Sequence, residues 1–279
     1  MIQPRRAFLR SSLAAAVFAL ALPAPRARAA DGPVGLVVVR EHGVGSAAQA
    51  QQYLDRLAAA AARVNGWPAV ESKYLTSRKL AARWIDAHRP SFGILSLGAY
   101  LGLRSKYGLS VVGKADVAGA GGRRYFIVAK AGKDLGACKG KRLASNHADD
   151  ARFVERVVAA GAFTLSDFTL VPTRRPVQTI KAVVRGEADC ALIDDGQHAD
   201  LSSIEGGKDL VTVWRSKELP PMVVVAFRGT DSAAVRTFRA NLTKICTGDG
   251  KKACQEVGIR KLVPASESAY RKVVAAYGS

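Results

Sequence analysis

The stretch PVQTIKAVVRGEADCALIDD, residues 176–195, holds the pattern that decides the fold. Between Pro176 and Arg185 apolar residues recur at the spacing of one helical face, and Gly186 follows as a helix stop. Proline is common at the first position of a helix and glycine just past its last, so both ends of this segment fit a helix. The apolar run 188–193 then reads as a buried strand. A helix that leads directly into a buried strand predicts an α/β protein.

The same alternation continues on both sides of this unit. Further strands are predicted at 34–39, 92–97, 109–112, 125–129, 141–144, 168–171, 210–214 and 222–227, and further helices at 46–65, 77–89, 98–106, 149–160, 232–246 and 266–277. Alternating strands and helices favour parallel sheets covered by helices on both faces. Two such series predict two α/β lobes, with the strands at 125–129 and 222–227 crossing between them.

The first thirty residues have the pattern of an export signal. Arg5 and Arg6 precede an apolar run at 13–22, and small residues end the stretch near Ala29 and Ala30. An apolar run this short cannot span a bilayer, which takes about 20 residues. The motif Arg-Arg-x-Phe-Leu-Arg resembles twin-arginine signals. We therefore expect a signal peptide cleaved near Ala29 or Ala30, and a protein located in the periplasm.

The chain is strongly basic, with a formal net charge of +19. Residues 1–30 contain five arginines and no acidic residue, so the mature chain keeps +14. Such a charge is compatible with an anionic ligand, an anionic membrane surface or nucleic acid. The basic residues are scattered and are not interleaved with aromatic residues, which argues against nucleic-acid binding.

Four cysteines in an oxidising compartment indicate two disulfides. Three pairings are possible. The short polar loop between Cys246 and Cys254 favours a bond between them, which leaves Cys138 with Cys190. No C-x₂-C pair indicates a zinc site.

Motifs for catalysis are weak. Gly108-x₄-Gly113-Lys114 imitates a phosphate-binding loop, but Ala115 stands where Ser or Thr is required, and the residues between the glycines look like a strand. No G-x-S-x-G element is present. Acidic residues at 194–200 could form a metal cluster or a helix start, and the helix start is favoured. We therefore expect a binding protein without catalytic residues, bound metal or cofactor.

Polar residues cluster where predicted strands end. In open α/β sheets, ligands bind outside the carboxyl ends of the strands, where helix N-termini present free N–H groups. The candidate ligand-binding residues at these junctions are Arg40, His42, Ser96, Tyr100, Ser145, Asn146, His147, Arg174 and Asp194. Among them, Arg174 would hold an anion, backbone N–H groups near 145–147 would add a second anchor, and Tyr100 would form an apolar wall.

Four segments resemble a known family. They are FGILSLGAY at 92–100, DLGACKGKRLA at 134–144, VRGEADCALID at 184–194 and WRSKELPP at 214–221. In order and spacing they resemble PhnD-like periplasmic solute-binding proteins, the phosphate/phosphite/phosphonate branch of the type 2 periplasmic-binding-protein fold. The resemblance implies two lobes, with mostly parallel sheets flanked by helices and two crossing strands at the hinge. It places lobe 1 at 31–129 plus 228–279 and lobe 2 at 130–227.

The resemblance also implies a function and partners. A monomer would bind a small anionic solute between the lobes and deliver it to the permease of an ABC importer in the inner membrane. The chain departs from the family at 145–150, where Asp149 and Asp150 would repel a phosphonate unless they face solvent. A ligand-sensing subunit for a membrane receptor is the alternative function, and an enzyme on the same fold is a third.

Overall fold

The computed structural model describes residues 32–42, 47–117 and 122–278, together with Met1. Gly32–Ser279 form one compact unit. The predicted signal peptide and cleavage zone fall in residues 2–31 and so lie outside the described residues.

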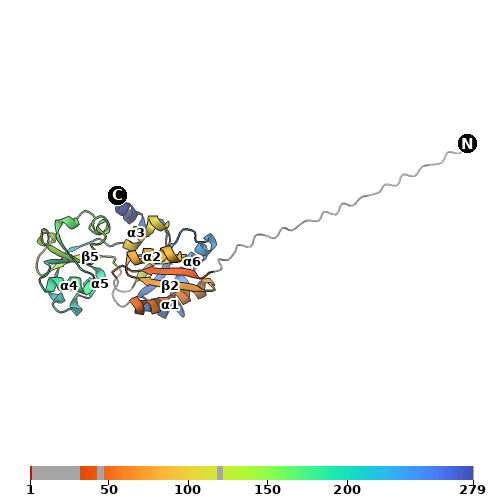
Figure 1. Ribbon diagram of the computed structural model, residues 1–279, viewed down its shortest axis with the longest axis horizontal. Helices are drawn as coiled ribbons and strands as arrows, with labels where there is room; N and C mark the ends of the chain where they lie inside the picture. The colour runs from red at the N-terminus through yellow and green to blue at the C-terminus, as the bar shows by residue number, and fades with distance from the viewer. Residues whose placement is uncertain (2–31, 43–46, 118–121, 279) are drawn as a thin grey trace. The chain divides into compact units, whose positions relative to one another are not determined.

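Two β-sheets organise the compact unit (Figure 1). The first has six strands in the order β11-β4-β10-β3-β1-β2, and the second has five in the order β7-β6-β8-β5-β9. The strands of the first sheet are β1 (Val34–Val39), β2 (Val70–Leu75), β3 (Phe92–Leu95), β4 (Ser110–Val117), β10 (Met222–Ala226) and β11 (Ile259–Pro264). Those of the second are β5 (Tyr125–Ala129), β6 (Arg142–Ser145), β7 (Thr169–Pro172), β8 (Cys190–Asp194) and β9 (Val211–Arg215).

Helices and single turns connect these strands. The α-helices are α1 (Ala47–Asn65), α2 (Arg78–His88), α3 (Leu97–Tyr107), α4 (Pro176–Val184), α5 (Asp195–Ala199), α6 (Ser232–Ile245), α7 (Gly250–Glu256) and α8 (Arg271–Gly278). The short turns are η1 (Leu135–Ala137), η3 (Leu165–Asp167), η4 (Leu201–Ser203), η5 (Gly207–Asp209) and η6 (Glu267–Tyr270), and η2 (Phe153–Val158) is a π-helix. Among the described residues, no helix has the length and apolar character needed to cross a bilayer.

Both sheets are mixed. In the first, β1 pairs in parallel with β2 and β3, whereas β10 runs antiparallel to β3 and β4 and β11 antiparallel to β4. In the second, β6 pairs in parallel with β7 and β8, whereas β5 is antiparallel to β8 and β9. In each sheet four strands point the same way. The predicted α/β class, with two sheets flanked by helices, is confirmed.

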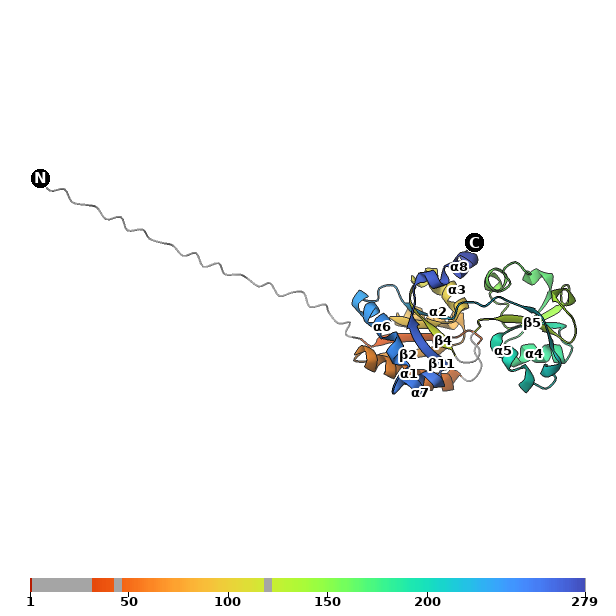
Figure 2. The same cartoon turned by 180° about the vertical axis from the view of Figure 1, so that it is seen from behind.

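Helices cover both faces of the first sheet because successive residues of its strands point to opposite faces. Leu36 and Val38 of β1 pack with Leu54 of α1 on one face. Val37 packs with Ile85 of α2 on the other face. Figure 2 shows α1 and α7 on one side of this sheet and α2 and α3 on the other. Burial on both faces explains why β1 is a nearly continuous run of valines.

The chain passes between the sheets before β5 and again before β10. Tyr125–Ala129 pair with β8 and β9 of the second sheet, and Met222–Ala226 pair with β3 and β4 of the first. The predicted lobe boundaries at 129/130 and 227/228 therefore assign these two strands to the wrong sheets. Both strands are apolar and fully buried, so their sequences carry no signal for which sheet they join.

The structure also corrects the predicted elements. Val70–Leu75 and Ile259–Pro264, for which no strand was predicted, are the two edge strands of the first sheet. Both strands carry exposed polar residues, Glu71 and Lys73 in β2 and Arg260 and Lys261 in β11, so neither has the continuous apolar run from which most other strands were predicted. The helix predicted at 149–160 is mainly the π-helix η2. Gly113 and Lys114 lie inside β4, which confirms the strand interpretation of the phosphate-loop imitation.

Both predicted disulfides are present. Cys138–Cys190 joins the turn after η1 to the start of β8, and Cys246–Cys254 joins the end of α6 to α7. Each bond therefore stays within the strands and helices of one sheet.

Candidate functional site

A partly enclosed cavity of about 300 Å³ lies between segments that follow strands of both sheets. The first sheet contributes Arg40–His42 after β1 and Ser96–Gly98 after β3. The second sheet contributes several residues of the segment 147–153, which follows β6, and several of the segment 194–200, which follows β8. These four strands present their carboxyl ends to the cavity, which is where open α/β sheets place ligands.

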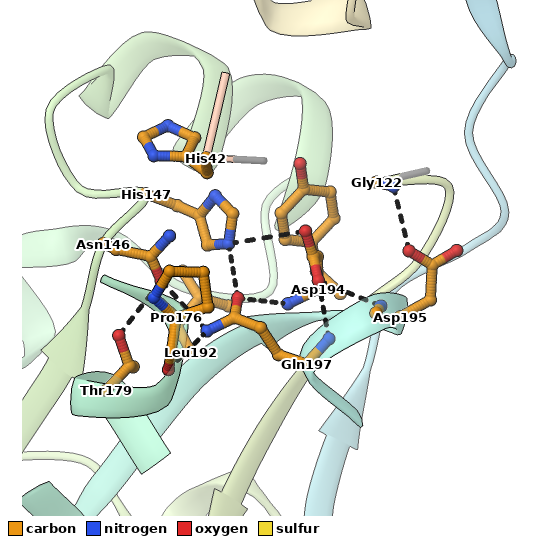
Figure 3. A network of polar contacts seen from close by, with 12 residues as sticks. His42, Gly122, Asn146, His147, Pro176, Thr179, Leu192, Asp194, Asp195 and Gln197 are labelled. Carbon is orange, nitrogen blue, oxygen red and sulfur yellow. Dashed lines mark hydrogen bonds and ion pairs between the residues drawn. The ribbon is translucent and has the colours of Figure 1, made fainter. Parts of the chain in front are cut away.

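His147 belongs to a buried hydrogen-bond network around Gln197 on the second-sheet side (Figure 3). Its Nε2 lies 2.8 Å from Oε1 of Gln197. The Gln197 amide nitrogen donates to Oδ1 of Asn146 at 3.0 Å and to the carbonyl oxygen of Pro176 at 3.2 Å. Because this amide nitrogen donates twice, Oε1 of Gln197 is an acceptor, and the network assigns the proton of His147 to Nε2. Burial, reinforced by His42, lowers the pKa of His147 to about 3, so this imidazole is neutral at ordinary pH.

Asp194 caps the N-terminus of α5 and borders the cavity. Its Oδ1 accepts the backbone N–H groups of Gly196 and Gln197, both at 2.9 Å, and its own N–H donates to Oε1 of Gln197 at 3.1 Å. This reciprocal arrangement is a capping box. Burial raises the pKa of Asp194, although the backbone N–H groups partly offset this. Asp195 accepts the N–H of Gly122 at 2.9 Å and so ties the segment between the sheets to α5.

An ion bridge links the two sides of the cavity. Nε and Nη2 of Arg78 donate to the two carboxylate oxygens of Glu41 at 2.7 and 2.8 Å, and Nη1 donates to Oδ2 of Asp150 at 2.5 Å. Burial opposes the charge on Arg78, but its hydrogen bonds to Glu41 and Asp150 and the negative charge of these carboxylates outweigh that effect and raise the pKa of the guanidinium. Beside the bridge, Nε2 of His42 lies 3.5 Å from Asp149, and the rings of His42 and His147 meet edge to face at 4.6 Å.

The cavity is acidic. The charged residues at its surface are the cations Arg40 and Arg78 and the carboxylates Glu41, Asp149, Asp150, Asp194 and Asp200. Five carboxylates against two guanidinium groups give a formal excess of three negative charges. A ligand that carries only negative charge would therefore meet a repulsive field.

A wider groove of about 990 Å³ lies on the other side of the ion bridge. Lys79 and Arg174 border this groove but not the cavity. Ser145 and Asn146 also border it, and the amide nitrogen of Asn146 is buried without a hydrogen-bond partner among the described residues. With the cations Arg78, Lys79 and Arg174 against the carboxylates Glu41, Asp149 and Asp150, the groove is formally neutral, whereas the cavity is acidic.

The structure separates the predicted ligand residues into three groups. Those that border the cavity are Arg40, His42, Ser96, His147 and Asp194. Those that border the groove are Ser145, Asn146 and Arg174, together with His42, which borders both spaces. Tyr100 borders neither.

The prediction that Tyr100 forms a cavity wall is wrong. Its side chain is fully buried, and its hydroxyl donates to Glu267 at 3.1 Å. Tyr100 lies in the first turn of α3 on the face that packs into the core, where its ring meets that of Tyr270. Ser145 is also committed to structure, since its Oγ donates to the Leu192 carbonyl oxygen and accepts the N–H of His147.

Sequence reasoning missed Arg78 and Gln197. Arg78 is the first residue of α2, and nothing in the local pattern distinguishes it from a solvated arginine. Gln197 sits in the five-residue helix α5, where the acidic residues had favoured a helix start, but no role was predicted for Gln197 itself. The one available signal was the spacing of Asp194 and Gln197, which is that of a capping box.

Comparisons with known proteins agree with this geometry. The model of the family described as ABC transporter, phosphonate, periplasmic substrate-binding protein matches residues 45–270. No curated protein sequence matches the chain significantly. Three solved structures share the fold, each with a TM-score of 0.66.

The first of these structures is PhnD1 of Prochlorococcus marinus in complex with methylphosphonate, at 10% identity over 87% of this chain and 96% of that one. The second is XAC2383 of Xanthomonas citri bound to ATP, at 14% identity over 88% and 96%. The third is PA3383 of Pseudomonas aeruginosa, a binding-protein component of an ABC phosphonate transporter, at 13% identity over 87% and 85%. At such identities the likeness shows the fold alone.

Proposed function

Because this chain belongs to the family of periplasmic substrate-binding proteins of phosphonate ABC transporters, we propose that it binds a small solute in the cavity and delivers it to an inner-membrane permease. The observation that carries the proposal is the cavity itself, which residues of both sheets border. A ligand held this way contacts both sides at once, so binding favours the state in which they are close together.

The charges of the cavity indicate the class of solute. The predicted acidic group would meet Arg40 and the first turn of α3, which Ser96 caps and whose Gly98 borders the cavity. The excess of carboxylates calls for a cationic group on the same solute, near Asp194. We therefore propose a small zwitterion that has an acidic group and an amine.

A matched pair of probes tests this ligand class. Methylphosphonate and aminomethylphosphonate differ by one amine, and calorimetric titration and thermal unfolding measure their binding. Aminomethylphosphonate should bind more tightly, and at 100 times its dissociation constant it should stabilise the protein by about 2.7 kcal/mol. Equal binding of the two, or a preference for methylphosphonate, would overturn the zwitterion proposal. If neither binds, the solute class is wrong as a whole.

Asp194→Asn is the variant that locates the amine. Asparagine also caps helices well, so α5 should survive the change. The variant should lose affinity for aminomethylphosphonate while its response to methylphosphonate stays the same or improves. A loss of equal size for both probes would mean that Asp194 shapes the site and does not contact the amine.

The remaining parts of the proposal concern export and assembly. Residues 1–30 would direct export through the twin-arginine route, and the mature protein would act in the periplasm as a monomer without catalysing a reaction. N-terminal sequencing of the mature protein should find a start near Ala30 or Asp31. Export that persists when Arg5 and Arg6 are both replaced by lysine would remove the twin-arginine route and leave the binding function intact.

A further inference from the structure

The bridge of Glu41, Arg78 and Asp150 is built more firmly than a surface ion pair. The side chains of Glu41 and Asp150 are only 9% and 12% exposed, and that of Arg78 is 26% exposed. Glu41 binds the guanidinium through both oxygens, the geometry that orients arginine best. Three short hydrogen bonds therefore hold one guanidinium between the two sides of the cavity.

Two glycines of helix α3 leave space for the side chain of Arg78. A Cβ atom added at Gly102 would lie 2.8 Å from Cζ of Arg78, and one added at Gly98 would lie 3.1 Å from Oε2 of Glu41 and 3.3 Å from Nη2 of Arg78. Gly98 and Gly102 are one turn apart and so share a face of the helix. A side chain at Gly102 would therefore displace the guanidinium, and one at Gly98 would press against the guanidinium and Glu41.

Asp150 is held from its own side as well. Its Oδ1 accepts the N–H of Phe153, the first residue of the π-helix η2, at 2.9 Å. Its Oδ2, which accepts Arg78, also accepts the hydroxyl of Tyr277 at 3.1 Å. Tyr277 belongs to α8, which packs against η2. The carboxylate is thus oriented before it meets Arg78.

The bridge lies between two spaces of different size. Glu41, Arg78 and Asp150 border both the cavity of about 300 Å³ and the groove of about 990 Å³, as do His42 and Asp149. Ligand sites range from roughly 300 to 1,000 Å³. The cavity alone is at the lower end of that range, and the groove alone is at the upper end.

We propose that the Glu41–Arg78–Asp150 bridge, which lies against Gly98 and Gly102, is a partition that determines ligand size. It closes the cavity to all but small solutes and keeps larger ones out of a site that would otherwise extend into the groove. The inference rests on the proposed function, because it assigns the ligand to the cavity. It names a determinant of selectivity that lies in the wall of the cavity and need not contact the ligand.

Two variants open the partition in different ways. The triple variant Glu41→Gln/Arg78→Ala/Asp150→Asn removes the guanidinium without leaving two unpaired buried carboxylates. Gly102→Ala keeps every charge and displaces the guanidinium sterically. Arg83→Ala is the matched control, because Arg83 is an exposed arginine on the same helix and borders neither space.

The first readout is ligand selectivity. ATP represents a large anion and aminomethylphosphonate a small zwitterion, and calorimetry gives both affinities for each protein. The wild type and Arg83→Ala should favour the small probe. Both opened variants should gain at least about tenfold in affinity for ATP relative to the small probe, equivalent to about 1.4 kcal/mol. An unchanged ratio in both opened variants, or a wild type that already binds ATP as tightly, would overturn the partition.

The second readout needs no ligand and so separates this inference from the proposed function. A cysteine introduced as Ser96→Cys borders the cavity but not the groove, and its reaction with a small methanethiosulfonate is compared with that of a bulky maleimide. With the bridge intact the bulky reagent should react much more slowly, and in the opened variants the two rates should converge. Rates that do not depend on the bridge would refute the partition even if a solute binds. Near-ultraviolet circular dichroism identifies any variant that has lost its fold.

Discussion

Replacing Arg78 alone should cost much more stability than its position near the surface indicates. Arg78→Ala removes three hydrogen bonds between charged groups, at 2.7, 2.8 and 2.5 Å. It also leaves the carboxylates of Glu41 and Asp150, which are 9% and 12% exposed, without their cation. Breaking a buried ion pair by removing one partner costs about 3–5 kcal/mol. Because Arg78 is itself 26% exposed, solvent relieves part of this penalty, and we expect a loss of about 3 kcal/mol.

Urea unfolding followed by tryptophan fluorescence measures this loss. With a slope of about 1–3 kcal/mol per molar urea, the midpoint should fall by about 1 M or more. The triple variant Glu41→Gln/Arg78→Ala/Asp150→Asn should recover most of the stability, because neutral partners replace the unpaired charges. The exposed Arg83→Ala should stay within about 0.5 kcal/mol of wild type. An Arg78→Ala variant as stable as Arg83→Ala would refute the reasoning, since it would show that the bridge is already solvated.

Two further predictions concern pH and the disulfides. The pKa of His147 is about 3 in the folded protein and 6.5 for a free histidine, so the unfolded chain binds the proton first as the pH falls. The contribution of neutral His147 to the free energy of unfolding is therefore complete above pH 6.5. It is lost toward pH 3, by about 1.4 kcal/mol per pH unit. Urea unfolding at several pH values should show a shallower decline for His147→Gln, and parallel curves would contradict this assignment. Removing Cys138–Cys190, which spans 52 residues, should cost about 4 kcal/mol on the chain-entropy model, against about 2.5 kcal/mol for Cys246–Cys254, which spans 8. Unfolding of the two double-alanine variants measures the difference, and the reverse order would contradict the model.

The sequence predicted the local units of this protein well. The run 34–39 and the stretch 176–195 carry periodicities that local physics dictates, and the structure places β1, α4 and β8 within a residue or two of the expected bounds. The sequence did not predict the edge strands Val70–Leu75 and Ile259–Pro264, because exposed polar residues interrupt their apolar pattern and each is held in the sheet by pairing with a neighbouring strand.

The residues of the site could be predicted only in part from the sequence. Residues at strand ends could be named from the sequence, because every parallel strand presents its carboxyl end to the same edge of the sheet. The sequence did not show which of these residues lie together around one cavity. The strand-end rule placed Tyr100 near the cavity but did not say which face of α3 it occupies, and in the structure it lies in the core.

The sequence by itself determined the α/β class, the resemblance to a family and, through the spacing of the cysteines, the favoured disulfide pairing. These features depend on periodicity and loop length, which are local properties of the chain. Only the tertiary structure decided that β5 and β10 join opposite sheets, and that Arg78 meets Asp150, 72 residues away. Contacts of that kind depend on where separate segments meet once the core is packed, and neither partner carries a local mark of the other. The acidic cavity and the bridge that borders it are therefore properties of the folded protein.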